Sequence, residues 1–120
     1  MTIEINGKTL EYEFATDKSS GERYVVITKG LVMDGTAIIP TRIDGIQVTS
    51  IGEGAFCGCS GLESVTIGTC VMRIGRHAFS GCSGLTSMTI PEGACIAGSV
   101  FEDCEKLERI HILDFINGAV

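Results

Sequence analysis

The sequence has no tryptophan, only two prolines and few basic residues: nine Lys and Arg stand against fifteen Asp and Glu. The resulting net charge of -6 argues against nucleic-acid binding, which needs clustered cations to meet phosphates. Anionic membrane surfaces are disfavoured for the same reason. No apolar run approaches the roughly 18 residues of a membrane-spanning helix. We therefore expect no nucleic-acid partner and no membrane insertion.

Signals for export and for catalysis are also missing. The N-terminus, MTIEINGKTLEYEF, has neither a basic flank nor a continuous apolar segment, so it is not a signal peptide. Either the chain is cytosolic or it begins after a signal has been removed. No phosphate-binding glycine loop follows a strand, no G-x-S-x-G elbow occurs and no carboxylate pair is distinctively placed. We expect neither an enzyme nor a cofactor.

What the chain does contain is a repeat, within a length of 120 residues that fits one domain. Its copies, IGEGAFCGCSGLESVTI (51–67), IGRHAFSGCSGLTSMTI (74–90) and IAGSVFEDCEKLERIHI (96–112), align without gaps, at spacings of 23 residues (56 to 79) and 22 residues (79 to 101). The matching apolar columns are Phe56, Phe79 and Phe101; Cys59, Cys82 and Cys104; Leu62, Leu85 and Leu107; Val65, Met88 and Ile110; and Ile67, Ile90 and Ile112. Such self-similarity predicts a solenoid, because each unit buries its apolar face only against its neighbours.

Within each repeat, the alternation L-x-x-V-x-I predicts a short strand, near 64–67, 87–90 and 109–112. A second extended segment is expected at Ile74 and at Ile96. The stretch between them, GRHAFSGC in one copy, predicts a compact turn or a short helix. Gly61 and Gly84 precede the leucines, where we expect the chain to need an unusual φ.

Residues 33–50 are predicted to form an atypical first repeat of the solenoid, which spans 33–112. Ala37 and Ile39 would match Val65 and Ile67, and Val48–Ile51 would match Val71–Ile74. Asp44-Gly45 would then form a small inserted loop. The last residues, 113–120, are too short for another repeat; they form a partial cap, fold over the last repeat or mark a truncation.

Residues 1–32 are predicted to form an N-terminal β-meander. Apolar residues alternate with polar ones on both sides of Asn6-Gly7, a pair that favours a tight hairpin turn. A polar loop (15–22) and a third strand (23–28) follow. Because an open solenoid end exposes both core and strand edge, we expect the meander to cap the first repeat.

The pattern I-G-x-x-A-F-x-G-C-x-x-L-x-x-V-x-I, with proline after the isoleucine, resembles the BspA-type leucine-rich repeat over roughly residues 33–112. The resemblance implies an α/β but mainly β, right-handed solenoid with a parallel sheet on its concave side. It also implies a surface or secreted adhesion module that binds host or matrix proteins. Gly68 in place of proline and Ala97–Val100 in place of G-x-x-A depart from the pattern and affect local turns only.

The candidate binding surface is the set of residues expected to point outward from the concave strands, which we call the outward stripe. Its members are Thr36, Ile38, Ser64, Thr66, Ser87, Thr89, Arg109 and His111. They are rich in hydroxyls and become basic toward the C-terminus. Ile38 is an apolar side chain placed where solvent or a partner must meet it. The alternative reading is a set of solvated, strand-favouring residues without a partner.

The six cysteines are expected to be buried, mostly free thiols, and Cys59, Cys82 and Cys104, which share one repeat position, are expected to fill the turns. Cys57, Cys70 and Cys95 share no repeat position, so exposure and oxidation are open to each of them. No pair has the two-to-four-residue separation of structural zinc sites, so no metal is predicted. A nucleophilic cysteine needs a histidine base, and His77 and His111 are expected on opposite sides of the solenoid.

Three hypotheses follow. The first is a non-catalytic module for protein–protein interaction that binds through the outward stripe. The second is a structural, self-associating repeat that uses the C-terminal edge together with Leu113, Phe115 and Ile116. A metal or redox protein built on the cysteines is the third.

Overall fold

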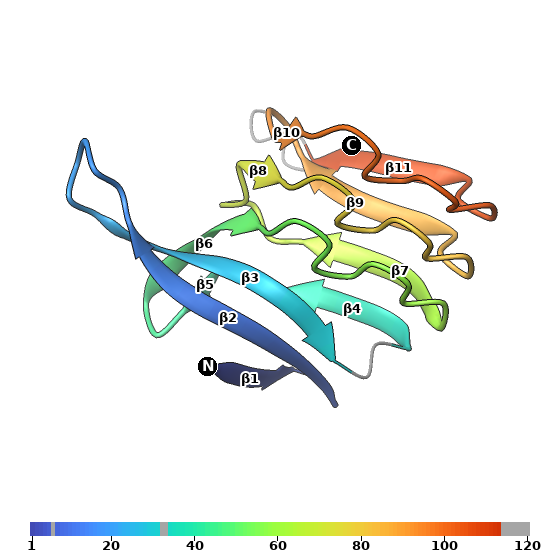
Figure 1. The fold of residues 1–120 in the computed structure, drawn as a ribbon, viewed down its shortest axis with the longest axis horizontal. Helices are drawn as coiled ribbons and strands as arrows, with labels where there is room; N and C mark the ends of the chain where they lie inside the picture. The colour runs from blue at the N-terminus through green and yellow to red at the C-terminus, as the bar shows by residue number, and fades with distance from the viewer. Residues whose placement is uncertain (6, 32–33, 114–120) are drawn as a thin grey trace.

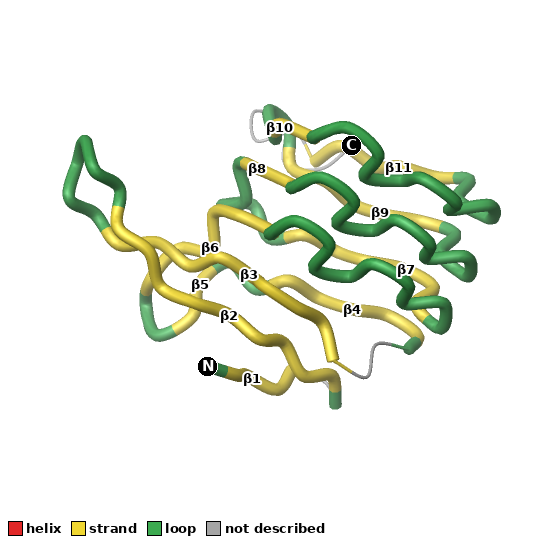
Figure 2. The backbone as a smooth tube through the Cα atoms, viewed as in Figure 1, coloured by secondary structure: helices red, strands yellow, loops and turns green. Residues whose placement is uncertain are grey.

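The computed structural model describes residues 1–5, 7–31 and 34–113, which form strands and turns and contain no helix (Figures 1 and 2). The strands are β1 (Thr2–Ile5), β2 (Lys8–Thr16), β3 (Arg23–Leu31), β4 (Gly35–Ile39), β5 (Arg42–Ile43), β6 (Ile46–Ile51), β7 (Leu62–Ile67), β8 (Arg73–Ile74), β9 (Ser87–Pro91), β10 (Cys95–Ile96) and β11 (Arg109–Leu113). Successive loops lie above one another in Figure 2, which is the appearance of a solenoid. The predicted solenoid is confirmed, with compact turns where a short helix was the alternative.

One sheet is entirely parallel and has the strand order β11-β9-β7-β4. Its register aligns Ala37 with Val65 and Ile39 with Ile67, as the sequence pattern predicts. Equivalent residues of consecutive repeats therefore stand side by side across the strands, because each repeat contributes one strand in the same register. We call this the four-stranded sheet.

The second sheet joins the N-terminal meander to the short strands of the repeats. Its order is β1-β2-β3-β6-β8-β10, with β5 paired to β6 in a small hairpin. Strand β3 is antiparallel to β2 but parallel to β6. The meander therefore does more than pack on the solenoid: its last strand is hydrogen-bonded into one of the two sheets. We call this the mixed sheet.

The division of the chain at 32/33 and 112/113 stays a prediction, because residues 32–33 and 114–120 lie outside the described residues. The hairpin turn predicted at Asn6-Gly7 is described only in part: Gly7 has a φ of 78° and β1 pairs with β2 around it. The small loop predicted at Asp44-Gly45 is confirmed as the turn between β5 and β6, with φ values of 52° and 77°.

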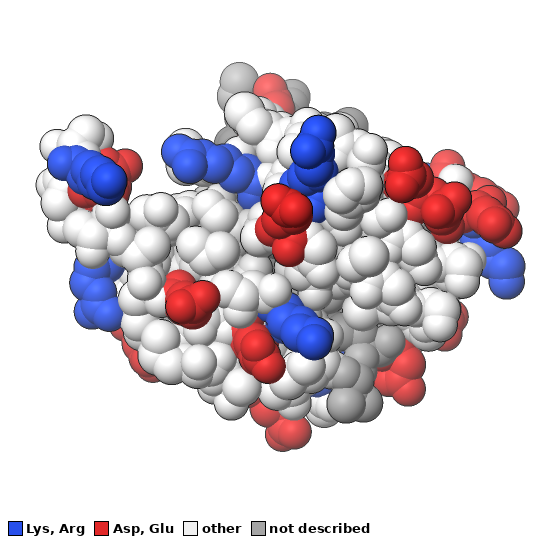
Figure 3. Space-filling model, viewed as in Figure 1, with Lys and Arg blue, Asp and Glu red and all other residues white. Residues whose placement is uncertain are grey.

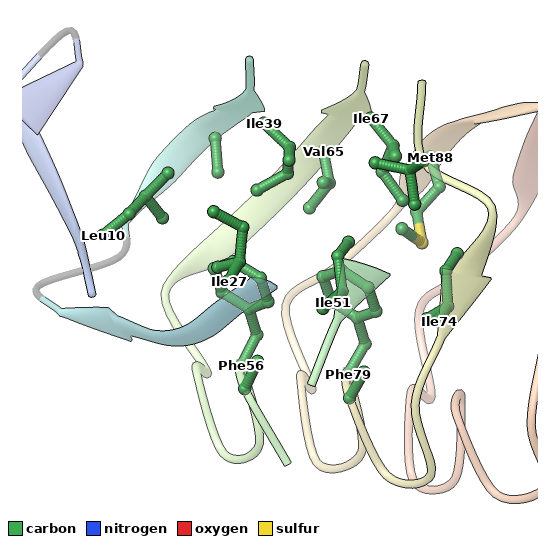
Figure 4. Close-up of a cluster of buried hydrophobic side chains, with 14 of the residues drawn as sticks. Leu10, Ile27, Ile39, Ile51, Phe56, Val65, Ile67, Ile74, Phe79 and Met88 are labelled. Atoms are coloured by element: carbon green, nitrogen blue, oxygen red, sulfur yellow. The ribbon is translucent and has the colours of Figure 1, made fainter. Parts of the chain in front are cut away.

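The core lies between the two sheets and is continuous from the meander into the repeats (Figure 4). Leu10 and Ile27 of the meander face the same interior as Ile39, Val65 and Ile67, all of them at most 2% exposed. The phenylalanine column forms as predicted. The rings of Phe56 and Phe79 stack with centroids 5.0 Å apart at 2°, and those of Phe79 and Phe101 lie 6.4 Å apart at 17°.

Two positions of each turn have a positive φ, and their occupants change along the chain. The first repeat has Gly54 and Gly58, the second His77 and Gly81, and the third Ser99 and Asp103. Neither Gly61 nor Gly84 belongs to this group, so the expectation of an unusual φ at these two positions is wrong. The requirement at Gly84 is space: a Cβ there would stand 2.5 Å from the carbonyl oxygen of Ser60 in the repeat below.

Candidate binding surface

The outward stripe is a real surface of the four-stranded sheet. Register places its eight residues in two rows that cross all four strands. One row runs Thr36, Ser64, Ser87, Arg109, and the other runs Ile38, Thr66, Thr89, His111. None of the eight is buried, whereas the residues between the two rows on β4, β7 and β9 are at most 1% exposed. The period of two along each strand explains the separation.

The stripe changes chemically from one end to the other. Near β4 the hydroxyls of Thr36 and Ser64 lie 2.9 Å apart within hydrogen-bonding distance, beside Ile38, which is 40% exposed. At β11 the stripe ends in Arg109 and His111, both exposed. A sheet surface of mostly short hydroxyl side chains with an apolar and a basic end offers donors, acceptors and a hydrophobic contact.

The repeated cysteines serve the packing of the turns. The thiol of Cys82 donates to the carbonyl oxygen of Phe56 at 3.1 Å, and that of Cys104 donates to Phe79 at 3.0 Å. Burial raises the pKa of the Cys82 thiol to about 12, and it also raises the pKa of Cys59 and Cys104. A nucleophile or metal ligand must be a thiolate, whereas burial favours the protonated thiol at these three positions.

The expectation of burial is correct for Cys82 alone: Cys59, Cys70 and Cys104 are half-buried, and Cys57 and Cys95 are exposed. All six are free thiols in the structure.

Comparison with known proteins identifies the repeat. Residues 39–118 match the family described as "BspA type Leucine rich repeat region (6 copies)". The chain belongs to the BspA-type leucine-rich repeat family. Among curated proteins, none matches its sequence.

The BspA-type chain is similar to a leucine-rich repeat protein of T. pallidum of known structure, with 30% identity and a TM-score of 0.74. That likeness covers 82% of this chain and 46% of the other. A leucine-rich cell surface protein of Faecalibacterium prausnitzii A2-165 is 22% identical, with a TM-score of 0.45, over 93% of this chain and 42% of that one. A leucine-rich repeat protein of Bacteroides ovatus is 24% identical, with a TM-score of 0.43, over 83% and 39%. The chain thus spans less than half the length of each.

Leucine-rich repeats of this kind commonly mediate protein–protein interaction and are typically non-catalytic. In the BspA-type chain, the histidines stand in different settings. His77 lies on a turn with its Nδ1 4.0 Å from Oε1 of Glu102, and His111 lies on β11 in the outward stripe. Within residues 1–5, 7–31 and 34–113, no group of three or more His, Cys, Asp or Glu side chains could hold a metal ion. Nor is there, in these ranges, a helix long and apolar enough to cross a bilayer.

One feature not predicted from the sequence is a hollow between the β2–β3 loop and strands β6 and β8. The sequence predicts an ordinary polar loop at residues 15–22, and nothing in their spacing indicates that they line a hollow together with β6 and β8. The sequence signal that could have indicated the floor of the hollow is a break in the apolar–polar alternation of residues 46–51. Thr49 and Ser50 both fall between the inward-facing Val48 and Ile51, which predicts a local bulge with two outward hydroxyls.

Proposed function

We propose that the chain is a non-catalytic module that binds a protein partner through the outward stripe. The observation that carries this proposal is the alignment of all eight stripe residues in two rows, none of them buried, over four consecutive strands. The exposed Ile38 supports it, since an apolar side chain of that size in a strand centre gains from being covered.

The family resemblance supports a finer version of the same proposal. Adhesion to host or matrix proteins, at the cell surface or after secretion, is the role that the resemblance suggests for this chain. The small hydroxyls and the strand backbone between them offer many weak, distributed contacts. Avidity in an array of such repeats raises the strength of binding without a single deep pocket.

The test is binding to a panel of purified, immobilised matrix proteins by the wild-type chain and by the triple variant Thr66→Glu, Thr89→Glu, His111→Glu. A matched control adds the same charge at exposed turn and loop positions: Ser60→Glu, Thr69→Glu, Ser83→Glu. We expect the stripe triple to lose at least tenfold in affinity and the control to lose less than threefold. Equal affinities of wild type and stripe triple for every partner bound would remove the outward stripe from the interface.

A second candidate function, self-association, is favoured by the C-terminal end of the solenoid. Ile96, Ile110 and Ile112 are 44–46% exposed, although their register partners in the preceding repeat are buried. Strands β10 and β11 also end the order of the two sheets. Of the tail residues predicted to take part, Phe115 and Ile116 lie outside the described residues, and Leu113 is described only as the last residue of β11.

Sedimentation over a wide range of concentration tests this candidate. We expect a concentration-dependent dimer that the variant Ile110→Lys, Ile112→Lys abolishes, while Ile38→Lys on the outward stripe leaves it intact. A chain that stays monomeric at millimolar concentration contradicts self-association.

A further inference from the structure

A hollow of about 180 Å³ lies on the outer side of the mixed sheet, remote from the outward stripe. The loop that joins β2 to β3 forms one wall, and strands β6 and β8 form the floor and the opposite wall. In Figure 1 this loop stands away from the body at the end of the long hairpin, and Figure 3 shows a notch in the outline between the two. The volume is below the roughly 300–1,000 Å³ of drug-sized sites, so it suits a single side chain.

The loop wall is held in shape by its own hydrogen bonds. The Asp17 carboxylate accepts from the Ser19 amide at 2.7 Å, the Ser19 hydroxyl at 2.6 Å and the Ser20 amide at 3.1 Å. The Asp17 amide in turn donates to the carbonyl oxygen of Glu22 at 2.8 Å, which closes the loop. One Asp17 oxygen is thus committed to the loop, and the hydrogen bond from Ser19 is the main cause of the lowered pKa of that carboxyl.

Two arginines from different strands are among the residues that line the hollow. Arg23 lies at the start of β3, and its Cζ stands 4.3 Å from the centroid of the Phe14 ring, a contact that restrains the side chain. Arg73 lies on β8, in register with Ser50 of β6. In the described part of the chain, neither arginine has a carboxylate oxygen within 4.0 Å. Both keep donors that can form paired bonds to a carboxylate.

The floor adds neutral donors. Val48 and Ile51 of β6 point into the core, so Thr49 and Ser50 between them both face outward, with their hydroxyl oxygens 3.5 Å apart. Both residues line the hollow. The lining of the hollow therefore combines these two hydroxyl residues with Arg23 and Arg73.

We propose that this hollow binds the carboxylate of an acidic side chain presented by a protein partner, with Arg73 and Arg23 as its charged donors. This proposal takes from the proposed function only that the partner is a protein. The hollow is a different surface from the outward stripe. Glu22 lines the same hollow. Asp17 lines it too, and the charge of Arg73 contributes to the lowered pKa of the Asp17 carboxyl. Both carboxylates repel a further negative charge there, so we expect an isolated Asp or Glu to bind better than an acidic run.

The probe for this proposal is N-acetyl-glutamate amide, and its matched control is the uncharged N-acetyl-glutamine amide. Backbone amide resonances of the wild-type chain are followed by NMR during titration with each. We expect saturable shifts at Ser20, Ser50 and Arg73 with the acidic probe, with a Kd on the order of millimolar, as two charge-assisted bonds at a part-exposed site would give. The glutamine probe should bind at least tenfold more weakly. Equal responses to the two probes, or no response, overturn the proposal.

Variants locate the binding. Arg73→Gln should weaken the acidic probe at least tenfold, and Arg73→Lys should weaken it less, since an ammonium keeps the charge but not the paired donors. Arg23→Gln is a second variant with the same expected direction. The stripe triple at residues 66, 89 and 111 should leave the titration unchanged. Loss of matrix binding in that triple with an unchanged titration separates the two proposals, and an unchanged Kd in Arg73→Gln overturns this one.

Discussion

The two ends of the solenoid differ in what covers them. At the N-terminal end the meander supplies Leu10, Val25 and Ile27, each at most 2% exposed, and closes the core. At the C-terminal end Ile110 and Ile112 occupy the same register positions as the buried Met88 and Ile90, yet they are 46% and 45% exposed. Apolar side chains at equivalent register positions are buried only where another repeat lies beside them. Their contribution to the free energy of unfolding therefore depends on the neighbouring repeat.

The backbone of the turns also becomes less favourable from the first repeat to the third. Gly54 and Gly58 occupy the positive-φ positions of the first repeat, whereas Ser99 and Asp103 occupy those of the third. A residue with a Cβ is strained in this region of φ and glycine is not. The third repeat therefore has less burial and more backbone strain than the first.

The largest expected effect compares two members of the phenylalanine column. Phe79→Ala removes a fully buried ring that is stacked on both sides and should cost about 3–5 kcal/mol of the free energy of unfolding. Phe101→Ala removes a half-buried ring with a described stacking partner on one side and should cost about 1–2 kcal/mol. Denaturant unfolding measures both. Equal losses would mean that the third repeat is covered in solution.

A second comparison tests the two ends directly. Leu10→Ala should cost about 2–4 kcal/mol, because the leucine is 2% exposed in the meander. Ile110→Ala should cost less than about 1 kcal/mol, since nearly half of its side chain already meets solvent. Unfolding at two protein concentrations sharpens the result: a cost for Ile110→Ala that grows with concentration would show that a second copy covers this end.

The buried thiol of Cys82 predicts that the free energy of unfolding depends on pH. The pKa of Cys82 is raised to about 12 from a usual 9.0 by burial, so the native state keeps a proton that the unfolded chain loses. Its contribution is fully present below pH 9 and is lost as the pH rises from 9 to 12, by at most about 1.4 kcal/mol per pH unit. Cys82→Ala should flatten this fall relative to wild type, as measured by denaturation between pH 8 and 11. If the free energy of unfolding of Cys82→Ala falls with pH as steeply as that of wild type, the Cys82 thiol is not the cause of the fall.

The smallest effects concern backbone strain. Ser99→Gly and Asp103→Gly together should stabilise the chain by about 1 kcal/mol, because relief of the positive φ exceeds the added entropy of the unfolded glycines. Gly54→Ala and Gly58→Ala should destabilise it by about 1–2 kcal/mol, although a Cβ at either position meets no atom within 4 Å. Thermal unfolding of the two double variants checks the opposite signs. Shifts of the same sign would show that φ does not decide these positions.

Much of the fold could be predicted because the repeat shows which residues are equivalent. With Phe56, Phe79 and Phe101 aligned, the match of Ala37 to Val65 and the two rows of the outward stripe follow from a period of two along each strand. The stripe's geometry was predictable for that reason. Its use as a binding surface could not be predicted in the same way, because the exposure of a side chain does not identify a partner.

The rest depends on contacts between segments without sequence equivalence. Nothing local indicates that β3 pairs in parallel with β6, since the alternation of Val25 and Ile27 suits either direction. The need for glycine at Gly84 comes from the close approach of Ser60 in another repeat. The hollow exists only because residues of the 17–22 loop border the same space as β6 and β8.

Strand β3 has a consequence for how the chain acquires its structure. Its antiparallel partner β2 is separated from it by only a short loop, so this hairpin can close early in synthesis, while the repeats are still being made. The free edge of β3 then offers a parallel template for β6, and each new coil meets a finished surface as it emerges. We expect the coils to assemble in order from the meander toward β11, each on strands that the preceding residues have already paired.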